Sequence, residues 1–305
     1  HLHFEVRNTD QHALDPEEFG IELADNLPPE LRGVRIYPLE GGANAMPYPG
    51  SAKGFALEKG TAGYRLKQDS IAAFGTVGFA LHVIDKYNGT DNLCGPRKLD
   101  LFVDDVPAFS VDLDHVDFSL QRYCNAHADY ALHKEQDMHY HRLYKLANNK
   151  LDLYGNEPLQ GRVATTPGKN QRIRMVATDA NGNRSELSFV LHGVSAKDAA
   201  AWPQPALSGT HMEQGTENQY SADGIRFKLP INALYENLDF HYSTKPRSAI
   251  AFSNVHVLHD KLTPIHVAAT LSIRPDSLPA TLRSKALILR LEANGKHAPV
   301  GGTWE

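Results

Sequence analysis

Short segments in which hydrophobic and polar residues alternate run along most of this 305-residue chain. In the N-terminal two thirds these segments are 34–39, 78–85, 98–103, 108–113, 171–179 and 185–191. Successive side chains of a β-strand point to opposite faces, so a period of two predicts half-buried strands. Asp104-Asp105 and Asn181-Gly182 separate consecutive segments and predict hairpin turns. Many short strands without a long helical pattern predict a β-sandwich, which we place at 28–194.

A second group of strand patterns follows an Ala- and Pro-rich stretch at 195–207. The members of this group are 225–229, 238–242, 268–273 and 286–291. We interpret the stretch as a linker and predict a second β-sandwich domain at 208–305. The last residues, Trp304-Glu305, directly follow a Gly-Gly turn, so we expect this second domain to be truncated at its C-terminus.

The stretch 121–149 fits the strand pattern least well, because it is polar and rich in histidine. We predict a polar, partly helical insertion between strands of the first sandwich. Its sequence HKEQDMHYH, residues 133–141, contains an H-x-x-x-D spacing and an H-x-H spacing.

The N-terminal heptapeptide HLHFEVR alternates strictly, with His1 and His3 on one face and Phe4 and Val6 on the other. This pattern predicts a half-buried strand. The sequence DPEEFG at 15–20 then supplies an N-cap aspartate, a proline at the first helical position and a terminating glycine. These residues predict a single helical turn.

Composition and charge exclude several function classes. The hydrophobic fraction of 41% can build real cores, and a net charge of −5 with a pI near 6.4 gives no basic surface for nucleic acid. We therefore expect no nucleic-acid partner. No window approaches the roughly 18 apolar residues of a membrane span, so we predict no transmembrane segment. The chain begins at His1 inside a predicted strand and shows no signal peptide, so we expect it to be part of a longer protein.

The two cysteines, Cys94 and Cys124, are too few to build a disulfide scaffold. They could pair in an exported protein, or they could be two separate buried thiols. The sequence leaves both alternatives open.

Histidine spacing alone is weak evidence for a site, because the chain has 16 histidines. H-x-H occurs at His1/His3 and His139/His141, where about one pair is expected by chance. Context separates the two, because His1 and His3 project from the same face of a strand, roughly 7 Å apart at the backbone. Neutral imidazole is a good ligand for zinc. Without wider context, two histidines on a solvated sheet face remain the favoured interpretation.

HLHFEVR followed by DPEEFG resembles the last catalytic strand of the lysostaphin/LytM family of peptidoglycan endopeptidases. In that family the second histidine of H-x-H is a zinc ligand and the first assists the zinc-bound water. The resemblance implies that His3 is a Zn²⁺ ligand and that His1 is the general base or transition-state stabiliser. The family's other two ligands come from an upstream H-x-x-x-D motif, which would precede His1. We therefore interpret 1–27 as the C-terminal remnant of a peptidase domain and expect the chain alone to be inactive.

Three further stretches resemble the accessory half of large Bacteroidetes-type members of this family, which carry immunoglobulin-like and other β-modules after the peptidase. These stretches are 84–89, 178–187 and 282–287. The resemblance implies a mostly β fold, in which the end of a peptidase β-domain precedes an immunoglobulin-like β-sandwich and a second β-sandwich. It also implies hydrolysis of cell-wall peptide bridges, with peptidoglycan as partner and a periplasmic or cell-surface location. The alternative is a non-catalytic binding or scaffolding module of the cell envelope.

Two other histidine clusters are interpreted as solvated surface rather than as metal sites. In the family, H-x-x-x-D and H-x-H come from separate strands, so His133, Asp137, His139 and His141 would need an unusual local fold. A second cluster comprises His256, His259, Asp260 and His266, but Pro264 interrupts any helix that would align them. The nucleophile motif G-x-S-x-G, the P-loop and the dinucleotide patterns are absent.

Overall fold

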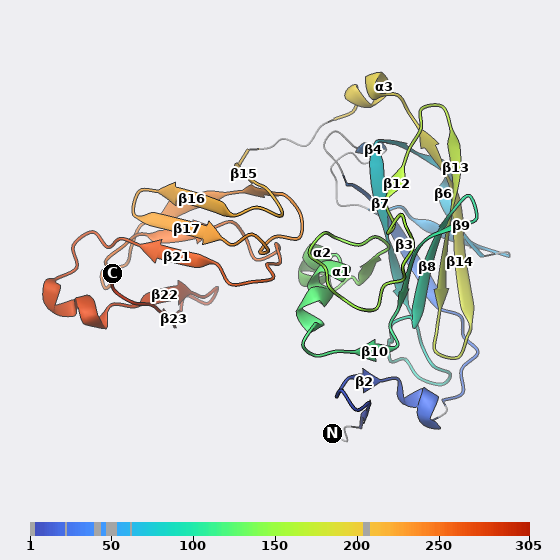
Figure 1. The fold of residues 1–305 in the computed structure, drawn as a ribbon, viewed down its shortest axis with the longest axis horizontal. Coiled ribbons are helices and arrows are strands. Elements are labelled where there is room, and N and C mark those ends of the chain that lie inside the picture. The colour runs from blue at the N-terminus through green and yellow to red at the C-terminus, as the bar shows by residue number, and fades with distance from the viewer. Residues whose placement is uncertain (1–3, 22, 40–43, 47–53, 62, 204–207) are drawn as a thin grey trace. The chain divides into compact units, whose positions relative to one another are not determined.

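The computed structural model describes residues 4–21, 23–39, 44–46, 54–61, 63–203 and 208–305, and it is mostly β, as predicted (Figure 1). The chain divides into two compact units. The first consists of His1–Ala206 with Leu262–Pro264, and the second of Leu207–Lys261 with Ile265–Glu305. Within the described ranges, no helix combines the length and the apolar character that crossing a membrane requires.

The first unit is built around two β-sheets. In the smaller sheet, β7 (Thr76–Ile84) pairs with β3 (Glu30–Pro38), β11 (Tyr140–Arg142) and β12 (Val163–Ala164). The larger sheet has the order β4-β6-β14-β13-β8-β9, and β5 also pairs with β6. Its strands are β4 (Asn44–Met46), β5 (Leu57–Gly60), β6 (Gly63–Phe74), β8 (Lys98–Val103), β9 (Val106–Asp112), β13 (Asn170–Thr178) and β14 (Arg184–Gly193).

The order of these strands is that of an immunoglobulin-like sandwich. Such folds place strands G, F, C and C′ side by side in one sheet and A, B and E in the other. The strands that correspond to G, F, C and C′ are β14, β13, β8 and β9, in that order. Those that correspond to A, B and E are β3, β7 and β12. All these pairs are antiparallel, whereas β6 joins β14 in parallel.

Alternation in the sequence explains the core between the two sheets. Strand β14 buries every second residue, and so does β8. Phe79 of β7 meets Phe189 of β14 edge to face across the sandwich, with ring centroids 5.6 Å apart. Edge-to-face aromatic pairs of this kind contribute about 0.5–1.5 kcal/mol beyond the area they bury.

Residues 121–149 are more closely packed than their polar composition indicates. They form η2 (Gln121–Tyr123), α1 (Cys124–His127), α2 (Tyr130–Gln136) and β11. Leu132 of α2 and Tyr140 of β11 cover Ala80 on the outer face of β7. The segment is partly helical, as expected, and its residues 134–139 are exposed, but several of its other polar side chains are buried and hydrogen-bonded. The Asp129 carboxylate, for example, accepts a 2.6 Å hydrogen bond from the Tyr37 hydroxyl.

The N-terminal segment lies against one end of the first sandwich. It forms β1 (Val6–Arg7), β2 (Ala13–Leu14) and η1 (Pro16–Phe19), and β2 also pairs with β10 (His115–Val116). The helical turn begins and ends as DPEEFG predicts: Asp15 caps it, and Gly20 ends it with a φ of 85°. Leu2 lies outside the described residues. Phe4, predicted on the buried face of the strand, is 62% exposed.

Arg97 links this N-terminal segment to the sandwich. Its guanidinium contacts Glu18 at 2.8 Å and Asp15 at 3.3 Å, and its Nε donates to Asp112 of β9 at 2.6 Å. Only about 20% of the Arg97 side chain is exposed, so water screens these ion pairs less than it screens typical surface pairs.

The second unit has a small core, which consists of Met212, Leu229, Ala233, Leu234 and Phe240. Its sheets are β16-β17-β21 and the pairs β15-β18, β19-β20 and β22-β23. The strands are β15 (Thr210–Met212), β16 (Asn218–Ala222), β17 (Ile225–Leu229), β18 (Leu238–Phe240), β19 (Tyr242–Lys245), β20 (Val255–Leu258), β21 (Thr270–Ile273), β22 (Ile288–Leu291) and β23 (His297–Gly301), with η3 (Ala280–Lys285) before β22. Asn294-Gly295 lies in the turn between β22 and β23, and Gly295 has a φ of 79°.

We predict that limited proteolysis of the native chain cuts first between 195 and 208. Helix α3 (Ala196–Ala200), capped by Ser195, occupies the start of this stretch and exposes Lys197. The two compact units meet in sequence at 206/207, so cleavage there interrupts neither core. Mass spectrometry of a thermolysin or trypsin time course should find two protected fragments. Resistance of this stretch, with earlier cuts inside either unit, would contradict the division.

Candidate metal centre

The two residues predicted to act at the catalytic zinc, His1 and His3, lie outside the described residues. The structure instead brings together histidines from 133–141, the segment in which both spacings occur. Cys94 and Cys124 are free thiols, not joined in a disulfide.

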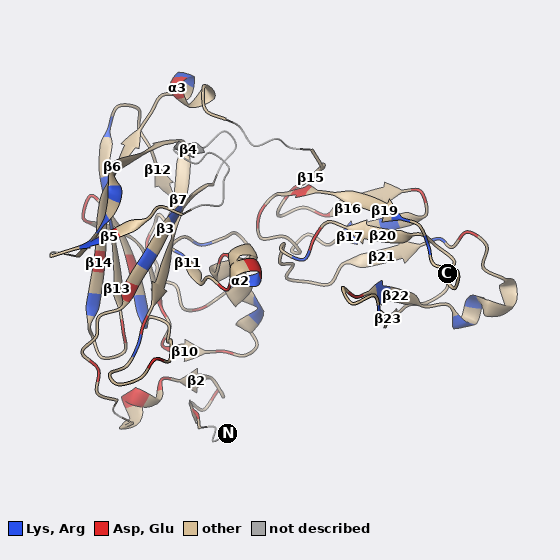
Figure 2. Cartoon of the chain, turned by 180° about the vertical axis from the view of Figure 1, so that it is seen from behind, with Lys and Arg blue, Asp and Glu red and all other residues tan. Residues whose placement is uncertain are grey.

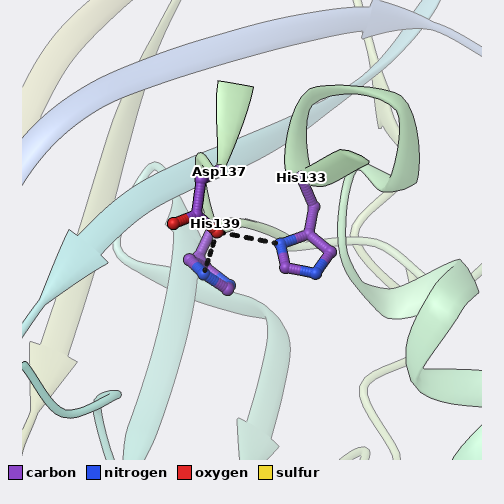
Figure 3. Close-up of side chains that lie close together, drawn as sticks. All are labelled: His133, Asp137 and His139. Atoms are coloured by element: carbon purple, nitrogen blue, oxygen red, sulfur yellow. Dashed lines mark ion pairs between the residues drawn. The ribbon is translucent and has the colours of Figure 1, made fainter. Parts of the chain in front are cut away.

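His133, Asp137 and His139 converge at the C-terminal end of α2 (Figure 3). The Oδ1 atom of Asp137 lies 3.9 Å from Nδ1 of His133 and 3.6 Å from Nε2 of His139. The two imidazole rings are 4.5 Å apart between centroids. One carboxylate thus lies between two imidazoles.

A reversal of the backbone at Asp137 creates this arrangement. His133 and Asp137 are one helical turn apart, so their side chains leave the same face of the helix. Asp137 ends the helix in the left-handed region, with a φ of 53°, and its N–H still donates to the carbonyl of His133. The chain then turns toward β11 and places His139 beside the other two side chains. Aspartate is one of the few residues besides glycine that enters this region often.

This group can coordinate a transition-metal ion such as Zn²⁺. Its three ligand atoms lie within 4.8 Å of one another, and imidazole with carboxylate is a common zinc ligand set. Nδ1 of His133 is buried and has no hydrogen-bond partner among the described residues. Ligands of a tetrahedral zinc ion are about 3.3 Å apart, so the side chains would have to close slightly. Because Asp137 is 89% exposed, the site is poorly preorganised, and we expect weak binding.

His141 does not complete a four-ligand site. Its Nδ1 lies 3.0 Å from Nε2 of His127, so one of these nitrogens donates and the other accepts a hydrogen bond. Nδ1 of His127 lies 3.2 Å from the hydroxyl of Tyr154. Burial lowers the pKa of His127 well below its ordinary value and lowers the pKa of His141 to about 4. The pair is therefore neutral and structural at neutral pH.

Among the described residues, the histidines of the second sequence cluster, at 256–266, do not converge on one point. His256 on β20 lies 2.8 Å from the hydroxyl of Tyr242, and His266 lies 3.1 Å from the hydroxyl of Tyr235. The ring of His259 stacks on His241. Each histidine thus has a separate neighbour, and His259-Asp260 is a contact between adjacent residues.

We predict that the first unit loses stability as the pH falls from 6.5 toward 4. In the unfolded chain His127 and His141 regain an ordinary pKa near 6.5, so that state binds more protons in this window. Their stabilisation is complete above about pH 6.5, and by pH 5 His141 alone costs on the order of 2 kcal/mol. Urea unfolding at pH 7 and pH 5 measures this difference. His141→Leu should reduce the pH dependence, and His192→Gln should leave it unchanged.

We also predict that this chain binds zinc weakly and that the double variant His133→Ala/His139→Ala binds it at least tenfold more weakly. Two of the three ligands at the end of α2 are then missing. Isothermal titration with zinc chloride measures the affinity, and His192→Gln serves as the control for loss of any one histidine. Tight stoichiometric zinc that survives dialysis of the double variant would contradict this assignment.

Residues 209–305 match the family described as the Zu5-like domain, and this range lies in the C-terminal third of the chain. No curated protein and no solved structure shows significant similarity to the chain. The second unit is therefore similar to a Zu5-like domain.

Proposed function

We propose that this chain is the C-terminal part of a zinc-dependent endopeptidase that hydrolyses peptide bridges of peptidoglycan, in the periplasm or at the cell surface. The observation that carries the proposal is the combination of HLHFEVR with DPEEFG at the N-terminus. In this proposal His3 supplies one of three protein ligands to zinc. His1, two residues before it in the sequence, takes the proton of the attacking water or stabilises the oxyanion.

Zinc in such a site polarises the scissile carbonyl and lowers the pKa of its bound water. The neutral imidazole of His3 is chemically suited to hold it. A catalytic zinc needs three protein ligands, and the proposal draws the other two from residues that precede His1. On its own, this chain is then expected to be inactive.

The attachment of the N-terminal segment to the first sandwich supports the proposal. Glu17 accepts hydrogen bonds from the Tyr87 hydroxyl and from the side-chain amide of Asn181. The same Asn181 amide donates to the carbonyl of Leu23 at 3.1 Å. Together with the ion pairs of Arg97, these contacts hold residues 15–23, which follow the proposed catalytic histidines in the sequence. The sandwich would thus act as a rigid support for the strand, and the exposed Phe4 would pack against the rest of the peptidase domain.

The alternative function is a non-catalytic binding or scaffolding module of the cell envelope. The specific observation that favours it is in the second unit, which matches the Zu5-like domain and exposes apolar side chains. Leu289 and Leu291 on β22 are each 45% exposed, and Val300 on β23 is 65% exposed. Such side chains suit a protein partner better than a polar glycan strand.

In a polypeptide that includes the residues preceding His1, we predict different effects for the two histidines. His3→Ala should abolish both hydrolysis and zinc retention, because a ligand is lost. His1→Ala should lower turnover by about 10²–10⁴-fold, the usual contribution of a general base, and leave zinc bound. Turnover of purified peptidoglycan, measured beside the zinc content, separates the two effects.

His192→Gln, far from the N-terminal segment in sequence, is the matched control and should keep both activity and zinc. Wild-type activity in both His1→Ala and His3→Ala would refute the peptidase proposal. An upstream sequence without H-x-x-x-D would favour the binding module.

A further inference from the structure

Three carboxylates meet where the N-terminal segment contacts the end of the first sandwich. Asp25 comes from the stretch before β3, Asp85 directly follows β7, and Asp179 directly follows β13. Their carboxylate oxygens all lie within 4.8 Å of one another. Asp85 is 5% exposed and Asp179 is 3% exposed. Figure 2 shows the acidic turn η1 at the same end of this sandwich.

Backbone amides hold each of these carboxylates in place. The N–H of Leu27 donates to Oδ1 of Asp25 at 3.0 Å, and the N–H of Asn183 donates to Oδ1 of Asp179 at 2.8 Å. The N–H of Lys86 donates to the carboxylate of Asp85. One carboxylate oxygen of Asp25, Oδ2, and one of Asp85, Oδ1, are buried and have no hydrogen-bond partner among the described residues. Oriented, buried and unpartnered oxygens are costly unless a cation binds them.

The charges around Asp85 favour the binding of a cation. Burial is the main cause that raises the pKa of the Asp85 carboxyl, and the backbone N–H of Lys86 opposes it. The negative charges of Asp179, Asp25 and Glu17 raise it further, and the resulting pKa is about 6. Nearby basic groups are engaged elsewhere: Arg97 contacts Asp15, Glu18 and Asp112, and the ammonium of Lys86 contacts Asp91 at 3.8 Å. At pH 7 three like charges would share this small volume.

We propose that Asp25, Asp85 and Asp179 bind one Ca²⁺ ion that fastens the N-terminal segment to the first sandwich. All three donors are oxygens, which suit a hard cation, and no histidine or cysteine belongs to the group. Calcium takes six to eight oxygens at flexible distances, so water and main-chain carbonyls can complete the shell. Magnesium demands near-ideal octahedral geometry and keeps its water more strongly, so three protein carboxylates on separate segments favour calcium.

The hairpin between β13 and β14 adds the second connection in this site. This hairpin has the sequence Asp179-Ala180-Asn181-Gly182-Asn183. The side-chain amide of Asn183 donates to Oδ2 of Asp179 at 2.9 Å and to the main-chain carbonyl of Asp25 at 3.3 Å. The hairpin therefore positions the Asp179 carboxylate and also holds the main chain at Asp25. This inference does not depend on the proposed peptidase activity.

The test uses the 305-residue chain, stripped of metal with EDTA and dialysed. Calcium chloride in the millimolar range should bind with a stoichiometry of one and raise the melting temperature of the first unit. Magnesium chloride should give a clearly smaller shift. The affinity for calcium should fall below pH 6, because protons compete for Asp85.

Asp25→Asn and Asp85→Asn should bind calcium at least tenfold more weakly. Without calcium they should be at least as stable as the wild-type chain, because each removes a buried repulsion. This second readout distinguishes loss of the site from loss of the fold. Asp91→Asn is the control, because its side chain is fully exposed, and it should respond to calcium as the wild type does.

Three outcomes would overturn the proposal. The first is no calcium-induced shift in the wild-type chain, and the second is an equal shift in the wild type and in Asp85→Asn. The third is stronger binding of magnesium than of calcium.

Discussion

The architecture of the first unit depends on burying strand β7 on both faces. One face contributes Val77, Phe79, Leu81 and Val83 to the core between the sheets, and the other places Ala80 beneath Leu132 and Tyr140. An apolar strand of this kind needs cover on each side, because exposed apolar surface costs about 25 cal/mol per Å². The polar-looking segment 121–149 provides the outer cover. Its tight folding against β7 brings His133 and His139 together and buries His127.

Both candidate cation sites follow from this arrangement. The histidine cluster lies in the segment that covers β7, and Asp85 is the residue directly after that strand. The two sites differ in how they are held. Asp137 is almost fully exposed and ends a short helix, whereas Asp85 is buried and fixed by a backbone amide. The ligands of the carboxylate site are thus held more firmly, so this site is better preorganised for a cation than the histidine cluster is.

Local features were predictable from the sequence, and features set by topology were not. Alternation placed a strand at 98–103, where β8 lies, and DPEEFG predicted η1 with its cap and its terminating glycine. Strand β6 was missed, because 63–74 alternates poorly and pairs in parallel with a distant partner. The convergence of His133 and His139 depends on a positive φ at Asp137, which no spacing reveals. Asp25, Asp85 and Asp179 come from three distant segments, and the sequence at 179–183 indicated only a turn.

The parallel pairing of β6 with β14 bears on how the chain reaches its native state. Ile71 pairs with Leu191, a separation of about 120 residues, and contacts this remote in sequence are formed slowly. During synthesis the larger sheet can close only after β14 has left the ribosome. Asn181 and Asn183, which hold the N-terminal segment, precede that strand directly. Within this unit, the N-terminal segment is thus synthesised before the residues that fix it in place.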